Sequence, residues 1–304
     1  MSPLEEEALR CVPRALGLED REAGSGTYGC FDRAHWHYQL ADFPSAWFQT
    51  GALVLALAWA GEGSPFAKHE KVRAWARAGL SFLVASANRD GSLAEVYPFE
   101  RSYCATAFAL LHATQALAVL GEAPQELVSG LARIARWLSG AEPTDAANQV
   151  AACAAALAQV AALTKDSRLE VATGERLDDL LAMQDRDGFF SEYGGQDPGY
   201  QSVTLACLAH LAGSRPDREP AIRGAAEKGA AALRAVLRAD GTYEWRTTRR
   251  RTQFLYPSGL VRFAPDLAAR FERGLEQGRV IEPAWLDDRY FLHLAADFLF
   301  AARG

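Results

Sequence analysis

The phrase Asp187-Gly188-Phe189-Phe190-Ser191-Glu192 recurs in two related forms, Asp90-Gly91-Ser92-Leu93-Ala94-Glu95 and Asp240-Gly241-Thr242-Tyr243-Glu244. In each copy an amphipathic segment precedes the phrase and an Ala-rich apolar segment follows it. The glycines of the three copies are 97 and 53 residues apart. Because 97 is close to two periods, this spacing indicates an internal repeat of roughly 50 residues.

The same register extends to both ends of the chain. It predicts a degenerate copy at Leu138-Ser139-Gly140-Ala141-Glu142 and further glycine turns at Gly26-Thr27-Tyr28 and Gly278. Each of the six turns stands ahead of an apolar segment. Six helical hairpins predict an all-α fold, an (α/α)6 toroid in which inner and outer helices form a complete or incomplete ring.

Apolar residues recur with the 3.6-residue period of helices, and no strand is expected. Segments that are apolar on nearly every face should be inner helices, whereas segments with one charged face should be outer helices that meet water. The inner helices are expected near 44–61, 102–119, 146–163, 200–213, 253–264 and 284–302, and the outer helices near 4–16, 69–87, 125–139, 170–184, 218–238 and 266–276.

The composition is that of a soluble globular protein, with 49% hydrophobic and 23% charged residues. A repeat array that closes on itself has one continuous core, so residues 1–304 are expected to form a single domain. No run approaches the roughly 20 apolar residues of a membrane span, and no transmembrane segment is predicted. The net charge of −6 argues against nucleic acid as a partner.

The predicted location is the cytoplasm. The acidic start, residues 1–7, lacks the features of a signal peptide. The five cysteines lack close-pair metal spacings, which fits reduced thiols in a reducing compartment. No P-loop, Rossmann glycine pattern or Ser-centred elbow is visible, and no cofactor is predicted.

The direction of each hairpin indicates where a ligand would bind. The glycine turns join the end of an outer helix to the start of the next inner helix, so all six turns should share one face of the ring. The inner-helix N-termini then converge around a central funnel. Their free N–H groups and positive dipole ends favour an anionic ligand.

The stretch Gln184–Gly195, running into Tyr200–Leu208, resembles a repeat of the prenyltransferase and squalene cyclase toroid superfamily. The same α/α toroid is similar to the catalytic domains of heparinase and alginate-lyase type polysaccharide lyases, glucuronyl C5-epimerases and unsaturated glucuronyl hydrolases. The resemblance implies the architecture of most of the chain. A fold shared by such different chemistries does not by itself name one.

Motifs argue against the isoprenoid members of this group. The nearest acidic pairs, Asp178-Asp179 and Asp287-Asp288, complete neither the Asp-x-Asp-Asp nor the Asp-Asp-x-x-Asp pattern of terpenoid cyclases. Protein prenyltransferases use a zinc site of Asp, Cys and His, and no Asp-x-Cys occurs here. Cys30, Asp32 and His35 are the zinc alternative, but a metal site is not predicted.

The densest polar and aromatic cluster, residues 28–44, enters the first inner helix. It offers acid/base groups and a stacking platform for a sugar ring. The alternative is that its aromatic side chains plug the funnel and its histidines make loop hydrogen bonds. The sequence leaves open which of the two histidines faces the pocket. The catalytic candidates here are His35, His37 and Tyr38, and the substrate-binding candidates are Asp32, Arg33 and Trp36.

The second loop places Tyr97, Glu100, Arg101 and Tyr103 at the predicted mouth. In the polysaccharide-lyase pattern a tyrosine or histidine removes the C5 proton of a uronate while a cation or amide neutralises the carboxylate. The resemblance implies Tyr103 or His37 as that base and Arg101 as the cation. The alternative for Glu100 and Arg101 is a helix cap and a surface ion pair.

Later repeats add further candidates. Tyr200 is a catalytic candidate at an inner-helix start, with Gln201 beside it as a binding residue. The basic run 246–253 supplies Arg250 and Arg251, which are predicted to clamp an anionic group or, alternatively, to remain solvated. The remaining binding candidates, which could instead only close the ring, are Tyr256, Asp288 and Arg289.

Two groups of polar residues are set aside. The carboxylates Glu95, Glu192 and Glu244 recur at one repeat position, which favours a scaffold function because a single active site has no use for three equivalent acids. The histidines on helical runs, His112, His210 and His293, are interpreted as structural or peripheral, and His69, which begins an outer helix, is excluded with them.

These features predict an enzyme that acts on an acidic, uronate-containing saccharide by lyase or epimerase chemistry, in polysaccharide assembly or processing. Its expected partner is an anionic saccharide. One alternative is a terpenoid cyclase or prenyltransferase-like enzyme with an aromatic funnel. Another is a non-catalytic toroid that binds carbohydrate or protein. A funnel lined by polar groups would favour a sugar ligand, and an apolar funnel would favour an isoprenoid. A mouth filled by the protein's own side chains would favour a scaffold function.

Overall fold

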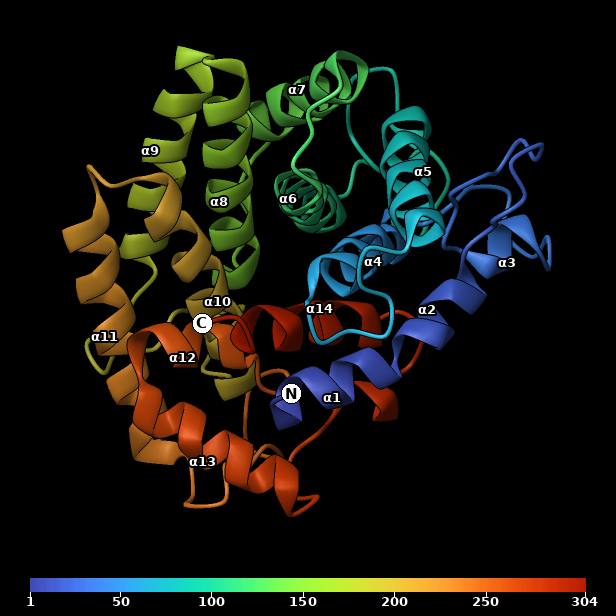
Figure 1. Cartoon of the computed structure of the whole chain (residues 1–304). Helices are drawn as coiled ribbons and strands as arrows, with labels where there is room; N and C mark the ends of the chain where they lie inside the picture. Colours follow the sequence, from blue (N-terminus) through green and yellow to red (C-terminus); the bar gives the residue numbers. More distant parts are fainter.

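The structure, a computed structural model that describes residues 1–304, is all-α and contains no β-strand, as the sequence predicts (Figure 1). The inner helices are α4 (Gly51–Ala60), α6 (Tyr103–Leu120), α8 (Ala147–Thr164), α10 (Pro198–Ser214), α12 (Pro257–Phe263) and α14 (Phe291–Ala301). The outer helices are α1 (Pro3–Arg10), α2 (Val12–Leu18), α5 (Glu70–Ser86), α7 (Gln125–Gly140), α9 (Ser167–Ala182), α11 (Glu219–Val236) and α13 (Pro265–Glu276).

The inner helices form a closed ring. Each packs against the next, from α4 through α6, α8, α10 and α12 to α14, and α14 packs back against α4. Every inner helix also packs against an outer helix that neighbours it in sequence, except α14, whose outer partner is α1 from the opposite end of the chain. The N-terminal and C-terminal helices therefore lie side by side and close the ring (Figure 1).

Helices α6 and α8 carry no charged residue, because they lie between other helices on nearly every side. By length and composition alone both could cross a membrane, contrary to the expectation that no such run exists. In the structure, 83% of the residues of α6 and 78% of those of α8 are buried inside the protein. Burial within the ring accounts for their apolar composition.

The repeated glycines make the turns that the phrase predicts. Gly91, Gly188 and Gly241 have φ angles of 101°, 98° and 73°. A Cβ on Gly91 or Gly188 would lie 2.5 Å from a backbone carbonyl oxygen of the next outer helix. Glycine is required there because an L side chain disfavours positive φ and has no room.

Two of the predicted turns differ from this pattern. In the first repeat the turn glycine is Gly29, with φ 91°, rather than Gly26. Gly140 is the last residue of α7 and has no positive φ, so the copy at 138–142 lacks the glycine turn. There Arg176 of α9 donates to the carbonyl oxygens of Ser139 and Ala141, at 3.3 Å and 3.0 Å.

The Arg176 contact belongs to a recurring arrangement. A basic side chain on one outer helix donates to carbonyl oxygens at or just beyond the end of the preceding outer helix, where no intrahelical partner is available. The donors are Arg133 to Val84 and Asn88, Lys228 to Asp185, and Arg270 to Leu237.

Helix starts near the mouth are less regular than the sequence predicts. Before α4 the chain forms the 3-10 helix η1 (Ala46–Thr50), and the short helix α3 (Arg33–Trp36) was not predicted. Helix α12 begins at Pro257 rather than near 253, and α14 at Phe291 rather than near 284, after η2 (Pro283–Trp285). Pro257 is well suited to the first helical turn because it lacks the N–H that would be unpaired there.

Candidate functional site

A central cavity of about 210 Å³ lies at the end of the ring where the inner helices begin. This is the position predicted for the funnel. Aromatic, cationic, acidic and amide side chains from all six repeats surround it. They are Trp47, Glu95, Cys104, Phe108, Asn148, Gln149, Tyr193, Tyr200, Val203, Arg250, Phe254, Tyr256, Arg289, Tyr290 and His293.

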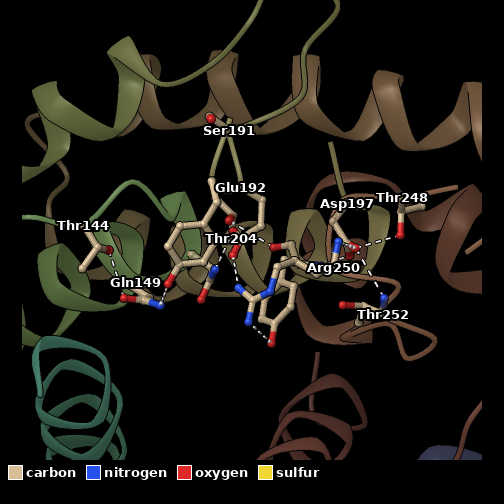
Figure 2. A network of polar contacts seen from close by, with 12 residues as sticks. Thr144, Gln149, Ser191, Glu192, Asp197, Thr204, Thr248, Arg250 and Thr252 are labelled. Carbon is tan, nitrogen blue, oxygen red and sulfur yellow. Dashed lines mark hydrogen bonds and ion pairs between the residues drawn. The ribbon is translucent and has the colours of Figure 1, made fainter. Parts of the chain in front are cut away.

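Arg250 lines the cavity, and side chains of two neighbouring elements fix its guanidinium (Figure 2). Its Nη1 donates to Oε1 of Glu192 at 2.7 Å, and its Nη2 lies 3.5 Å from the hydroxyl of Tyr200. The guanidinium carbon lies 4.5 Å from the ring centroid of Tyr200 and 5.0 Å from that of Tyr193. Two aromatic rings and one carboxylate therefore orient this guanidinium toward the cavity.

Glu192 lies behind Arg250 and is only 2% exposed. Its Oε2 accepts a hydrogen bond of 2.6 Å from Nδ2 of Asn148, so one carboxylate holds two side chains that line the cavity. Burial raises the pKa of Glu192 to about 7, although the hydrogen bond from Asn148 and the charge of Arg250 act in the opposite direction. This carboxyl therefore changes its charge near neutral pH.

The loop that carries Arg250 is anchored by Asp197, which is 1% exposed (Figure 2). One carboxylate oxygen caps α10 by accepting from the backbone N–H of Tyr200 at 3.1 Å. The other accepts from Oγ1 of Thr248 at 2.9 Å and from the N–H of Arg250 at 3.0 Å. A helix cap in one repeat thus fixes the arginine loop of the next.

A second arginine–glutamate pair faces the cavity from another side. Arg289 Nη2 donates to Oε1 of Glu95, and its guanidinium carbon lies 5.2 Å from the ring centroid of Trp47. The other oxygen of Glu95 accepts from Oγ of Ser102, the N-cap of α6, at 2.6 Å. Two guanidinium groups, each held by a carboxylate and an aromatic ring, therefore line one cavity.

The floor of the cavity is a buried histidine cluster. Thr50 Oγ1 lies 2.9 Å from Nδ1 of His112 and 3.1 Å from Nε2 of His293, and that Nε2 is also 3.1 Å from the carbonyl oxygen of Trp47. Because a carbonyl only accepts, Nε2 of His293 carries a proton. Burial lowers the pKa of His293 to about 3 and that of His112 well below its usual value, so both imidazoles are neutral at pH 7.

Below this floor a small cavity of about 20 Å³ follows the axis of the ring. It is lined by His112, His293, Gln115 and Asp297, among others. Asp297 caps α12 by accepting from the backbone N–H and the hydroxyl of Ser258, and burial raises the pKa of Asp297 to about 7. The axis of the toroid is thus polar at its centre and not a uniform apolar core.

Four of the residues predicted from the sequence line the central cavity: Tyr200, Arg250, Tyr256 and Arg289. Tyr200 and Tyr256 lie 6.0 Å and 5.7 Å, between ring centroids, from Phe254, which joins them in one aromatic wall. Burial raises the pKa of Tyr200 above its usual value, so its phenol is protonated at pH 7.

The candidates of the first loop do not line the cavity. Asp32 caps α3 by accepting from the N–H of Ala34, and it also accepts from the N–H of Ser45, so its carboxylate braces the loop. His35 Nδ1 lies 2.9 Å from the carbonyl oxygen of Ala41. The others pack against one another, with the ring of His37 tilted against Trp36 and edge-on to Tyr38, and with Arg33 over the rings of Trp36 and Tyr38.

The candidates of the second loop also lie outside the cavity lining. Glu100 accepts from the N–H groups of residues 95, 96 and 97 through one oxygen, and Arg101 pairs with Asp90 at 3.0 Å. Tyr97 is 68% exposed, whereas Tyr103 is buried and its hydroxyl has no hydrogen-bond partner. Arg101 therefore makes a surface ion pair, as in the alternative interpretation, whereas Glu100 braces its own loop and the helix cap is Ser102.

Three further candidates lie away from the cavity lining. Gln201 is buried and holds the Asp-Gly turn, since its amide accepts from the N–H of Phe190 and donates to the carbonyl oxygen of Gly188. Arg251 is exposed, with a φ of 54°. Asp288 pairs with Arg14 at 2.7 Å on the outside of the ring.

Several residues that line the cavity or lie directly behind its lining were set aside by sequence reasoning. Glu95 and Glu192 were interpreted as scaffold because they recur, and His293 because it lies on a helical run. The signal that would have found the glutamates is their pairing with residues unique to one repeat, Arg289 and Arg250. That pairing joins segments 194 and 58 residues apart and has no local sequence pattern.

No group of three or more His, Cys, Asp or Glu side chains is placed to hold a metal ion. The zinc alternative is not assembled, because Asp32 and His35 are engaged in the loop contacts above and Cys30 Sγ lies 3.8 Å from the carbonyl oxygen of Asp32. The chain matches no protein-family model, and no curated protein matches it.

Proposed function

We propose that the protein is an enzyme of acidic saccharides that binds a uronate-containing chain in the central cavity and acts on it by lyase or epimerase chemistry. The observation that carries the proposal is the pair of oriented guanidinium groups, Arg250 and Arg289, in a cavity lined by tyrosine and tryptophan rings. Guanidinium groups recognise carboxylates in a bidentate manner, and aromatic rings offer faces for sugar rings.

Binding would use the two cations and the amides together. Arg250 would neutralise the uronate carboxylate, while Asn148 and Gln149, which also line the cavity, would donate to sugar hydroxyls or to the carboxylate. Neutralising the carboxylate makes the C5 proton of the uronate more acidic. These guanidinium and amide donors favour an acidic sugar over an uncharged hydrocarbon as the ligand.

The chemistry would use a base and an acid of the same cavity. The imidazole of His293, whose Nε2 already carries a proton, would take the C5 proton of the uronate at Nδ1, and the protonated phenol of Tyr200 would donate its proton. In β-elimination the C5–H electrons form the C4–C5 double bond, the C4–O bond breaks, and the phenol protonates the leaving oxygen. In epimerisation C5 is reprotonated from the opposite face and no bond to O4 breaks.

The first test is incubation with a panel of uronate oligosaccharides, with two readouts. Ultraviolet absorbance of the unsaturated product reports elimination, and deuterium uptake at C5 from heavy water reports proton exchange. Tyr200→Phe should lower the rate of elimination at least ~100-fold, the usual effect of removing a general acid. His37→Ala, outside the cavity, is the matched control and should retain the wild-type rate.

Binding without elimination or exchange would leave the non-catalytic carbohydrate binder as the function. Equal activity of Tyr200→Phe and wild type would exclude Tyr200 as the acid. Absence of both binding and reaction on every uronate substrate would overturn the proposal.

A further inference from the structure

A second cavity, of about 360 Å³, lies in the fifth repeat. Its lining comes from the turn between α11 and α12, from the segment before α12, from Phe271 of α13 and from the residues that follow α13. These are all at the end of the ring where the inner helices begin, which is also the end that holds the central cavity. None of the residues considered so far for the reaction lines it.

One extended segment separates the two cavities. Gln253 and Leu255 line the second cavity, whereas Phe254 and Tyr256 line the central one. This alternation is the side-chain pattern of extended backbone. The hydroxyl of Tyr243 donates to the carbonyl oxygen of Thr252 at 2.5 Å, which holds the segment in place. The two cavities are therefore neighbours on opposite faces of a single fixed chain segment.

The second cavity has an excess of cationic donors. Three arginines line it, Arg238, Arg246 and Arg279, against the two carboxylates Asp240 and Glu244. Asp240 is occupied within its turn, where it accepts from the N–H and the hydroxyl of Thr242 at 3.1 Å and 2.7 Å.

The remaining carboxylate does not satisfy the arginines. Glu244 lies 3.8 Å from Arg238 and 3.7 Å from Arg246, which is too long for hydrogen bonds. The side chain of Arg279 makes no hydrogen bond or ion pair within the protein. Arg246 lies 4.6 Å above the ring of Trp245, which orients its guanidinium plane. The guanidinium donors of Arg246 and Arg279 are thus available to an anion.

We propose that the second cavity is an outer subsite that binds another acidic sugar unit of the same saccharide, with Arg246 and Arg279 contacting its carboxylate or sulfate group. This inference rests on the proposed function of the central cavity. A chain that leaves the central cavity needs to pass only the segment 252–256 to reach the second. The outer subsite would add affinity for longer chains and would set the length of saccharide that the protein prefers.

The experiment is isothermal titration of wild type with acidic oligosaccharides of increasing length, compared with the double variant Arg246→Gln/Arg279→Gln. The variant should bind the longest oligosaccharides at least ~10-fold more weakly, since two charge-assisted contacts are lost, and the shortest ones within about twofold of wild type. Arg273→Gln, which removes an exposed charge of α13 outside the cavity, is the control and should match wild type at every length.

The outcomes separate the two proposals. If Arg250→Ala abolishes binding at every length while the double variant binds long chains as wild type does, the second cavity is not a subsite and the central site stands. If the double variant loses affinity equally for short and long chains, the arginines do not act at an outer position and the inference fails. If wild type binds no acidic saccharide, both proposals fail.

Discussion

A single residue type at one repeat position takes different functions according to its neighbours. Glu95, Glu192 and Glu244 are equivalent by sequence. Glu192 is buried and pairs with Arg250, and Glu95 pairs with Arg289. Glu244 is half-exposed, and its carboxylate lies farther from the guanidinium groups of Arg238 and Arg246. The recurrence of these glutamates therefore predicts that each one stabilises its own loop. The arginine with which each glutamate pairs decides whether that glutamate also lies at the cavity.

Glu192 should make ligand binding depend on pH. An anion bound to Arg250 disfavours the charged form of Glu192, so binding takes up a proton and affinity should rise as pH falls through the pKa of about 7. Titration calorimetry with a uronate oligosaccharide at pH 6, 7 and 8 measures this slope. In Glu192→Gln the slope should disappear, because the neutral amide cannot titrate.

Glu175→Gln is the control for that measurement, since Glu175 is an exposed carboxylate of α9 and takes part in no side-chain hydrogen bond or ion pair. It should keep the wild-type slope. A wild-type affinity that rises with pH over this range would contradict the coupling between protonation of Glu192 and anion binding at Arg250.

At the scale of elements, the turn between an outer and the next inner helix has two solutions. In most repeats a glycine with positive φ brings the turn against the neighbouring outer helix. In the third repeat α7 ends at Gly140 without a glycine of positive φ. The hairpin is preserved because Arg176, like the basic side chains of the glycine-containing repeats, donates to the free carbonyl groups at the end of the preceding outer helix.

Gly188→Ala and Gly140→Ala should therefore differ strongly. Gly188 has a φ of 98°, and a Cβ there would lie 2.5 Å from the carbonyl oxygen of Lys228, so the free energy of unfolding should fall by at least about 2 kcal/mol. Gly140 is helical and has nothing within 4 Å of an added Cβ, so Gly140→Ala should be neutral or stabilising by up to ~1 kcal/mol. Urea unfolding followed by circular dichroism measures both, and equal losses would refute the distinction.

At the scale of the whole molecule, closure of the ring joins the two ends of the chain. Leu4 is 1% exposed on α1, which packs against α13 and α14. One contiguous cluster of 91 buried hydrophobic residues includes both Leu4 and Leu299, so the ends belong to the same core. The protein should consequently unfold as one cooperative unit.

The variant Leu4→Ala tests whether the protein unfolds as one cooperative unit. The cavity that the substitution leaves should lower the free energy of unfolding by about 3 kcal/mol. Near-ultraviolet circular dichroism and far-ultraviolet circular dichroism should report the same shifted midpoint. Glu6→Ala, on the exposed face of α1, is the control and should change stability by less than about 0.5 kcal/mol. Separate midpoints for the two probes would mean that α1 detaches independently of the ring.

The sequence by itself determined the helical hairpins and their order. The apolar period predicts a helix over 146–163 where the structure has Ala147–Thr164, and the repeated phrase predicts the turn at Gly188. These features are local, since helix periodicity and a positive-φ turn depend on residues a few positions apart.

Only the tertiary structure decided which side chains of the mouth face the cavity. Tyr200 and Arg250 line it, whereas His35 and His37 make contacts within their own loop. Loops carry no period from which a direction can be inferred. The direction of Arg250 is set by Asp197 and Glu192, which lie in the preceding repeat, and such long-range hydrogen bonds exist only once the ring has closed.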